Sequence, residues 1–310
     1  MNILLTGATG FIGKNLLKQI EKQEIFKNSK IYIITRNPEK LPQINTLNLI
    51  ILRTKSYNYS KELFQKKIDE IDVVIHLGSN TPKSQGEADN IELSNCNVTS
   101  TYSLINNLPT PPKKFLFAST LDVYKNANKK IHEKSLIVPI SFYGYSKLYC
   151  EKMLEIWAEK NNVLLQVCRI GHIYGEGEEE YSKIIPTVIR KIINNDQPQI
   201  YGSGNEFRSF LYVGDLTSYL IKIFNLNFSI SPINLVSSQS YKITEVVDTI
   251  IGISKKNIKP KRVDFFKPKR DLLFDTTKLD KTIGERETSI FDGLRNEYNY
   301  MLDLFQHAQN

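Results

Sequence analysis

The chain has 310 residues in ordinary globular proportions, 41% hydrophobic and 24% charged. These proportions exclude a disordered or collagen-like chain, and no apolar run approaches the roughly 20 residues of a membrane span. A net charge of +8 favours an anionic partner. Because the basic residues are scattered rather than gathered in stripes, we expect a phosphate-bearing small molecule, no nucleic acid and no membrane.

The first predicted strand, residues 2–6, runs directly into a glycine-rich turn and a predicted helix over residues 11–21. The glycines of this turn have the spacing G-x-x-G-x-x-G. They allow a sharp turn and the close approach of a pyrophosphate, which the helix N-terminus attracts. We therefore predict a dinucleotide-binding loop that consists of Gly7, Thr9, Gly10, Phe11, Ile12 and Gly13.

The end of the second predicted strand, residues 30–35, indicates which dinucleotide is preferred. An acidic residue there would accept hydrogen bonds from the ribose 2′-hydroxyl of NAD. The sequence instead has Arg36, which can pair with a 2′-phosphate and stack on adenine. We therefore expect NADP as the cofactor, with NAD as the alternative.

Further short apolar runs alternate with helical patterns through the first half of the chain. The remaining predicted strands are residues 48–53, 72–77, 114–119 and 164–170. Such runs, bounded by turn signals, are typical of a parallel sheet covered on both faces. We predict an α/β fold with a doubly wound parallel sheet of the Rossmann type.

A Tyr-x-x-x-Lys pattern, Tyr143 and Lys147, lies between the last two of these strands. On a helix the two side chains share a face and can meet one substrate. Tyrosine is a poor base at neutral pH, but a nearby ammonium and an oxidised nicotinamide would both favour the phenolate. Thr120 can donate a hydrogen bond to the same substrate oxygen. The predicted catalytic set is Thr120, Tyr143 and Lys147, and Lys147 would also hold the nicotinamide ribose.

The regular alternation ends after about Gly175, where Glu178–Glu180 is expected to belong to a solvated loop. Later helices are predicted over residues 184–194, 215–224, 242–251 and 289–305. We predict a dinucleotide-binding domain over residues 1–175, to which parts of about 205–240 return. A smaller α/β substrate-binding domain is predicted mainly over residues 176–310.

The three cysteines, Cys96, Cys150 and Cys168, are odd in number and widely spaced. This argues for a reducing compartment and against disulfides or a zinc site. The histidines do not cluster either, so no metal site is expected. Since the N-terminal residues lack the basic start of a signal peptide, we expect a cytoplasmic protein.

Taken together, these residues resemble the extended short-chain dehydrogenase/reductase family, in its branch of nucleotide-sugar epimerases, dehydratases and reductases. The resemblance rests on GATGFIG at 7–13, DVVIHLGS at 72–79, NVTST at 97–101, PISFYGYSK at 139–147, RIGHIYGEG at 169–177 and YGSGNEFRSFLYVGDL at 201–216. It implies a homodimer, a nucleotide-diphosphate sugar as substrate, and a cofactor lined by the main chain of Leu77 and Gly78. The substrate residues that it implies are Ser79, Thr120, His172, Arg208 and Arg270.

Departures from the family patterns narrow the expected reaction. Dehydratases of this family have Thr-Asp-Glu where the chain has Thr120-Leu121-Asp122, which disfavours a 4,6-dehydratase. Epimerase-reductases that act at carbons 3 and 5 add a cysteine near the sugar, and residues 119–124 contain none.

Two enzymatic hypotheses remain. The main one is NADPH-dependent reduction of a 4-keto-6-deoxy sugar nucleotide, with Tyr143 as proton donor; it is favoured by Arg36 and by His172, where epimerases usually have Asn. The alternative is an NAD-dependent nucleotide-sugar 4-epimerase or 4-dehydrogenase. A non-catalytic cofactor-binding regulator is a distant third, because such proteins typically lose Tyr-x-x-x-Lys.

Overall fold

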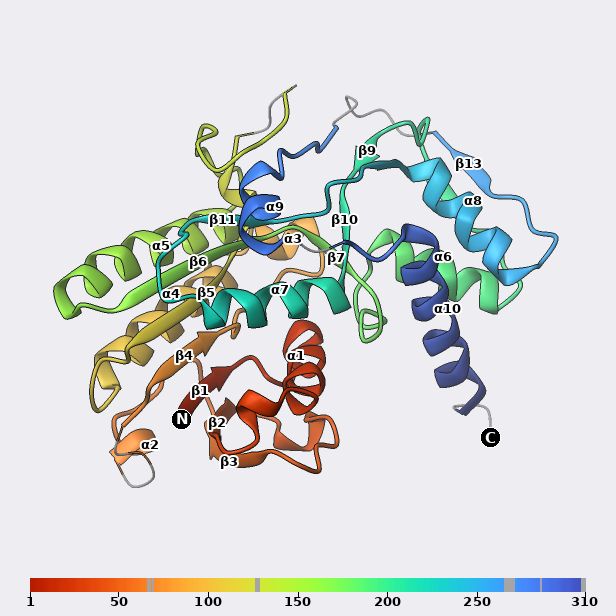
Figure 1. The fold of residues 1–310 in the computed structure, drawn as a ribbon. Helices are drawn as coiled ribbons and strands as arrows, with labels where there is room; N and C mark the ends of the chain where they lie inside the picture. Colours follow the sequence, from red (N-terminus) through yellow and green to blue (C-terminus); the bar gives the residue numbers. More distant parts are fainter. Residues whose placement is uncertain (66–67, 69, 126–128, 265–270, 285, 308–310) are drawn as a thin grey trace. The chain divides into compact units, whose positions relative to one another are not determined.

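The computed structural model describes residues 1–65, 68, 70–125, 129–264, 271–284 and 286–307 (Figure 1). The chain divides into two compact units. Unit 1 comprises Met1–Lys125, Leu136–Ile170 and Thr217–Asn234, and unit 2 comprises Asn126–Ser135, Gly171–Leu216 and Leu235–Asn310. The roles predicted from the sequence for residues 1–175 and 176–310 stay predictions.

Unit 1 is built on a seven-stranded sheet with the strand order β11-β6-β5-β4-β1-β2-β3 (Figure 1). Its strands are β1 (Asn2–Thr6), β2 (Lys30–Thr35), β3 (Asn48–Arg53), β4 (Val73–His76), β5 (Lys114–Thr120), β6 (Leu164–Ile170) and β11 (Ile233–Leu235). The pairs formed by β1 to β6 are parallel, which confirms the predicted doubly wound sheet. The strand order reverses between β1 and β4, and sheets of this kind bind ligands at the carboxyl ends of the strands beside such a reversal.

Helices cover both faces of this sheet, so alternate residues of each strand are buried on opposite sides. On one face Phe115 packs with Leu104 and Leu154, which come from α4 and α5. On the other face Leu116 lies with Leu16 of α1 and with residues of α7. Burial on both faces explains the nearly continuous apolar runs of the strands. The helices are α1 (Phe11–Glu21), α2 (Glu62–Gln65), α3 (Gln85–Ala88), α4 (Ile91–Asn107), α5 (Phe142–Asn161) and α7 (Val213–Asn225), which begins in unit 2.

The start of α5 is fixed by its own sequence. Ser141 precedes the helix, and its hydroxyl accepts the N–H of Gly144 at 3.1 Å. A serine cap of this kind satisfies one of the N–H groups that the first turn leaves without a helical partner. Tyr143 therefore lies in the first turn of α5, and Lys147 follows one turn later.

Unit 2 combines helices with three short strand pairs. These are β7 (His172–Tyr174) with β10 (Phe210–Tyr212), β8 (Gln199–Tyr201) with β13 (Lys261–Val263), and β9 (Phe207–Arg208) with β12 (Tyr241–Lys242). Its helices are α6 (Ile184–Ile193), α8 (Ile243–Ser254), α9 (Thr277–Ile283) and α10 (Ile290–His307). The core lies where α6, α8 and α10 meet, and Ile189, Val247 and Leu294 are buried there. Within the described ranges no helix combines the length and the hydropathy needed to cross a membrane.

Candidate active site

The glycine loop joins β1 to α1 in a conformation that only glycine accommodates. Gly7 has a φ of +76°, and a Cβ on it would lie 2.6 Å from the backbone N of Gly78. A Cβ on Gly13 would lie 2.1 Å from the carbonyl oxygen of Gly7. Helix α1 begins at Phe11, and Gly10 before it provides no side-chain cap, so the helix N-terminus is suited to an anion. These features fit the pyrophosphate of a dinucleotide, and the predicted residues Thr9, Phe11 and Ile12 belong to the same turn.

The loop that follows β4 lies beside this glycine turn. The N–H of Gly78 donates to the hydroxyl of Thr6 at 2.9 Å, and the Leu77 N–H donates to the Thr6 carbonyl at 3.3 Å. Nδ1 of His76 lies 2.6 Å from the same Thr6 hydroxyl. Burial, and then the charge of Lys147, lower the pKa of His76 to about 3, so its ring is neutral at neutral pH. The predicted cofactor residues Leu77 and Gly78 are thus fixed at the carboxyl ends of β1 and β4.

Arg36 lies at the exposed end of β2. Its guanidinium is 4.2 Å from the centre of the Tyr57 ring, and its Nη2 donates to the Tyr57 hydroxyl at 2.9 Å. Stacking on an aromatic ring orients a guanidinium, whose other N–H groups can still donate in the guanidinium plane. Tyr57 was not predicted from the sequence, because its contact with Arg36 joins two separate loops.

The hydroxyl of Tyr143 is buried in a polar group of side chains. Hydrogen bonding with Thr81, Thr120 and Ser79 lowers its pKa, whereas burial, the largest effect, and the charge of Asp122 raise it. The net pKa lies above the ordinary value, so the neutral phenol is favoured. The lowering expected from the sequence depends on an oxidised nicotinamide beside the phenol, so it stays a prediction.

Lys147 is buried one helical turn after Tyr143. Its Nζ lies 4.2 Å from the centre of the Phe117 ring. Burial lowers the pKa of Lys147 to about 8, although the charges of Cys150 and Glu151 act in the opposite direction. At neutral pH most of the lysine therefore still carries its charge.

Asn97 of α4 ties the loop after β4 to the catalytic helix. Its Oδ1 accepts the Ser79 hydroxyl at 3.0 Å and the N–H of Asn80 at 2.7 Å. Its Nδ2 donates to the Ser146 hydroxyl at 3.2 Å. No role was predicted for Asn97 from the sequence beyond its place in the motif at 97–101, because its burial depends on the packing of α4.

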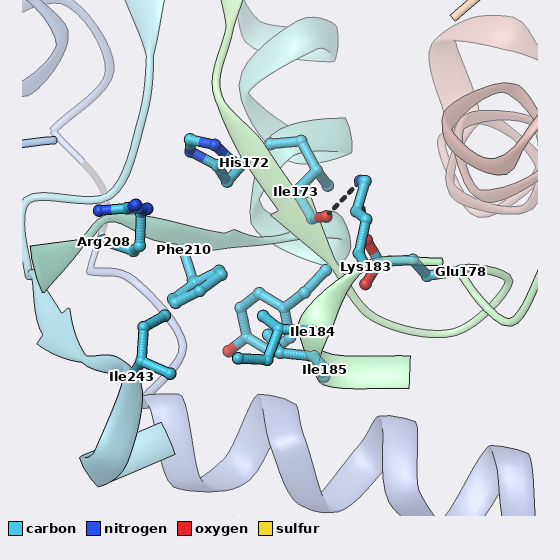
Figure 2. A pocket seen from close by; sticks show the side chains of 10 residues that line it. His172, Ile173, Glu178, Lys183, Ile184, Ile185, Arg208, Phe210 and Ile243 are labelled. Carbon is cyan, nitrogen blue, oxygen red and sulfur yellow. Dashed lines mark hydrogen bonds and ion pairs between the residues drawn. The ribbon is translucent and has the colours of Figure 1, made fainter. Parts of the chain in front are cut away.

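Unit 2 contains a cavity of about 300 Å³ (Figure 2). Most of its wall is apolar, and its polar lining comes from two sides, with His172 and Arg208 on one and Lys183 and Glu178 on the other. Two of the predicted substrate residues, His172 and Arg208, thus line one cavity. The third from this part of the chain, Arg270, lies outside the described residues. The apolar lining consists of Ile173, Tyr174, Ile184, Ile185, Phe210 and Ile243.

The expectation that Glu178–Glu180 is solvated was wrong for Glu178, whereas Glu180 is exposed. The Glu178 side chain is buried, with Oε1 2.7 Å from Nζ of Lys183, which also donates to the Ile173 carbonyl at 3.3 Å. Burial raises the pKa of Glu178 to about 7, and Lys183 opposes that rise. An acidic, glycine-containing stretch is typical of an exposed loop. The burial of this carboxylate results from tertiary packing, which the sequence pattern does not show. In the described part of the chain, no group of three or more His, Cys, Asp or Glu side chains is arranged to hold a metal.

A family model and several known proteins are similar to this chain in sequence. A family model described as "NAD dependent epimerase/dehydratase family" matches residues 3–234. A dTDP-D-glucose 4,6-dehydratase of Dictyostelium discoideum is 29% identical over 241 residues, which are 70% of this chain and 54% of that protein. The chain thus spans about half the length of this relative. A putative UDP-glucose 4-epimerase of Methanocaldococcus jannaschii is 24% identical over 315 residues, 96% of this chain and 98% of that protein.

Solved structures show the same fold. The UDP-glucuronic acid 4-epimerase from Bacillus cereus, in complex with UDP-glucuronic acid and NAD, superposes with a TM-score of 0.83. The two chains are 22% identical, and the match covers 98% of this chain and 100% of that one.

Proposed function

Because this chain belongs to the NAD-dependent epimerase/dehydratase family, we propose that it is an NAD-dependent nucleotide-sugar 4-epimerase. It is an enzyme of the extended short-chain dehydrogenase/reductase type. The Methanocaldococcus relative, similar over nearly its whole length, and the Bacillus structure are both described as 4-epimerases. They support this reaction over the reductase that we expected first from the sequence.

The observation that carries the proposal is the proton-transfer group at Tyr143. Leu121 stands where dehydratases of this family have their acid, and the proposal takes Tyr143 as the group that moves the proton, with Thr120 and Ser79 as its hydroxyl partners. A 4-epimerase needs only one such group, because the proton removed from the sugar hydroxyl is returned to the same oxygen. A dehydratase needs a further acid and base to remove water.

In the proposed reaction, different residues of unit 1 bind the cofactor, transfer the proton and orient the sugar. Held at the glycine loop and at Gly78, the dinucleotide would supply the hydride acceptor and donor. The Tyr143 hydroxyl takes and returns the proton, and the Thr120 hydroxyl donates a hydrogen bond to the sugar oxygen. Lys147, buried and charged, favours the phenolate and holds the cofactor ribose.

The cavity of unit 2 is proposed to bind the nucleoside diphosphate. Its apolar wall suits a base and ribose, and the guanidinium of Arg208 suits a diphosphate, which it can meet with two parallel hydrogen bonds. Lys183 adds a second cation to the lining, and His172 a further polar group.

The second candidate is the NADPH-dependent 4-ketoreductase. Arg36 favours it, because an exposed guanidinium oriented by Tyr57 at the end of β2 can pair with the 2′-phosphate of NADP. The raised pKa of Tyr143 also suits a proton donor.

The experiment that separates the two is to denature freshly purified protein and identify any released nucleotide by mass spectrometry. The epimerase predicts tightly held NAD and interconversion of UDP-hexose 4-epimers without added cofactor. An empty protein that binds NADPH more tightly than NADH, and that oxidises it with a 4-keto sugar nucleotide, would replace the epimerase with the reductase.

We also propose a homodimer formed by α4 and α5. Tyr145, Tyr149 and Ile156 of α5 and Tyr102 of α4 are each more than half exposed. A row of large apolar side chains on one helix is costly in water and suits a second copy of the same surface. Sedimentation of Tyr149→Glu tests this, since a monomer is expected for the variant and a dimer for the wild type.

A further inference from the structure

A buried ion pair lies in unit 1, outside the set of residues assigned to the reaction. Glu151 of α5 and Arg169 of β6 are 0% and 1% exposed. Nη2 of Arg169 lies 2.7 Å from Oε2 of Glu151, and its Nε donates to Oε1 at 3.0 Å. A buried pair of this kind contributes little net stability, because both charges lose their hydration. The role of the pair is therefore to be found in the groups to which it is hydrogen-bonded.

The pair holds both ends of one short segment. The Ser119 hydroxyl donates to Oε1 of Glu151. Nη1 of Arg169 donates to the Tyr124 hydroxyl at 2.7 Å, and that hydroxyl donates to Oδ1 of Asn234 at 2.8 Å. Ser119 precedes and Tyr124 follows the segment formed by Thr120 and the 3₁₀ turn Leu121–Val123.

This segment packs directly against the first turn of α5. A Cβ on Gly144 would lie 2.6 Å from the carbonyl oxygen of Asp122, so the two backbones touch. Within the segment the Thr120 hydroxyl accepts the N–H of Asp122 at 3.2 Å. Tyr143 directly precedes Gly144 in the first turn of α5; its hydroxyl is hydrogen-bonded with Thr120 and feels the charge of Asp122. A displacement of either end would therefore move Thr120 relative to Tyr143.

We propose that Glu151 and Arg169 are positioning residues for proton transfer, which hold Ser119 and Tyr124 so that Thr120 stays at the Tyr143 hydroxyl. Two parallel N–H···O bonds fix the direction of a guanidinium as well as its distance, which an apolar contact would not do. The pair also adds no net charge beside Lys147, one turn before Glu151. The kinetic consequences rest on the proposed function, whereas the structural role of the pair does not.

The test uses two mild variants, one at each end of the segment. Ser119→Ala removes the hydrogen bond to Glu151, and Tyr124→Phe removes the two hydrogen bonds of its hydroxyl, with Arg169 and with Asn234; both variants leave the ion pair intact. Glu151→Gln is avoided, because it would leave the Arg169 charge buried without its partner and risks loss of the fold. The matched control is Ser103→Ala, because Ser103 of α4 is equally buried and its hydroxyl accepts the N–H of Tyr59 at 3.0 Å instead.

Each variant is measured in three ways: steady-state kinetics, melting temperature and hydrogen–deuterium exchange of peptides that cover residues 119–124. We expect kcat to fall about tenfold in Ser119→Ala and in Tyr124→Phe, with KM for the sugar nucleotide within about twofold. Exchange should rise in residues 119–124 only. Ser103→Ala should leave both kcat and the exchange of this segment unchanged.

Unchanged kcat and unchanged local exchange in both variants would overturn the positioning role. So would a loss of kcat matched by the control, or exchange that rises throughout unit 1, because either result indicates general destabilisation. If the wild type turns over no nucleotide sugar, the proposed function fails, but the exchange of residues 119–124 still decides the role of the ion pair.

Discussion

Lys147 places its Nζ 4.2 Å from the centre of the Phe117 ring, inside the core of unit 1. The face of an aromatic ring attracts a cation and partly offsets the hydration that burial removes. Burial still lowers the pKa of Lys147 to about 8, which brings its titration close to physiological pH. The charge that the proposed reaction needs is therefore lost under mildly alkaline conditions.

This predicts a fall of kcat on the alkaline side of the pH profile. Below about pH 8 Lys147 is charged and, in the proposed reaction, favours the phenolate; above that pH the charge is lost. Lys147→Arg keeps a charge at every accessible pH, so its residual activity should show no alkaline limb near pH 8. The measurement is kcat between pH 6 and 10 for both proteins. An identical alkaline limb in both would assign it to another group.

Tyr143→Phe should abolish turnover and leave cofactor binding nearly intact. Loss of a positioned proton-transfer group costs about 10²–10⁴ in rate. The substitution keeps the ring, and the hydrogen-bond partners of the lost hydroxyl, which are Thr81, Thr120 and Ser79, do not belong to the glycine loop. The measurements are kcat with a UDP-hexose and the stoichiometry of bound nucleotide. Retained turnover would remove Tyr143 from the mechanism.

Arg208→Ala should raise KM for the sugar nucleotide and change kcat little. Arg208 lines the cavity of unit 2 as a cation, and a charge-assisted hydrogen bond to a diphosphate contributes about 1.5–3 kcal/mol. We therefore expect KM to rise about tenfold to a hundredfold. Binding of UDP by calorimetry gives the same quantity without turnover, and equal affinity in both proteins would place the diphosphate elsewhere.

Gly13→Ala should prevent cofactor binding, because the new Cβ would lie 2.1 Å from the Gly7 carbonyl oxygen. Gly252→Ala is its matched control. That glycine lies inside α8 with nothing within 4 Å of the added Cβ, and alanine there should stabilise the helix by up to about 1 kcal/mol. Urea unfolding and nucleotide content test both variants. A Gly13→Ala protein that retains its nucleotide would contradict the tight turn.

His76 should make the protein less stable in mild acid. Its folded pKa of about 3 lies below the unfolded value near 6.5, so its contribution is complete above pH 6.5 and is lost as the pH falls towards 3. At pH 5 the loss from this group is about 2 kcal/mol. Urea unfolding at pH 7 and pH 5 measures it against His76→Asn, in which this part of the pH dependence should disappear.

Residues whose role follows from local chemistry were predictable. The glycine turn was predicted because its three glycines lie within seven residues, at positions where the backbone must turn sharply. Gly7 indeed has a positive φ. The predicted bounds of β1, β2, β3 and β6 coincide with those of the structure. The residues of β1 and β6 are buried or half-buried throughout, and β2 is buried except at Lys30. β3 lies at the edge of the sheet and is largely half-buried, but its apolar residues 49–52 still mark it in the sequence.

Features that depend on distant partners were not predictable. The strands β7 to β13 contain only two or three residues each, too few for an alternating pattern to be visible. Glu178 and Glu151 read as ordinary surface or helix carboxylates in the sequence. Both are buried, because Lys183 and Arg169 respectively compensate their charge.

The sequence by itself determined the doubly wound sheet, the glycine loop and the membership of Tyr143 and Lys147 in one helix face. Each of these follows from backbone sterics or from a burial period that neighbouring residues share. Only the tertiary structure decided which charges are buried, that the Glu151–Arg169 pair holds both ends of the Thr120 segment, and that burial raises the pKa of Tyr143. The physical reason is that the free energy of a charge depends on the groups that packing brings around it, and these come from distant parts of the chain.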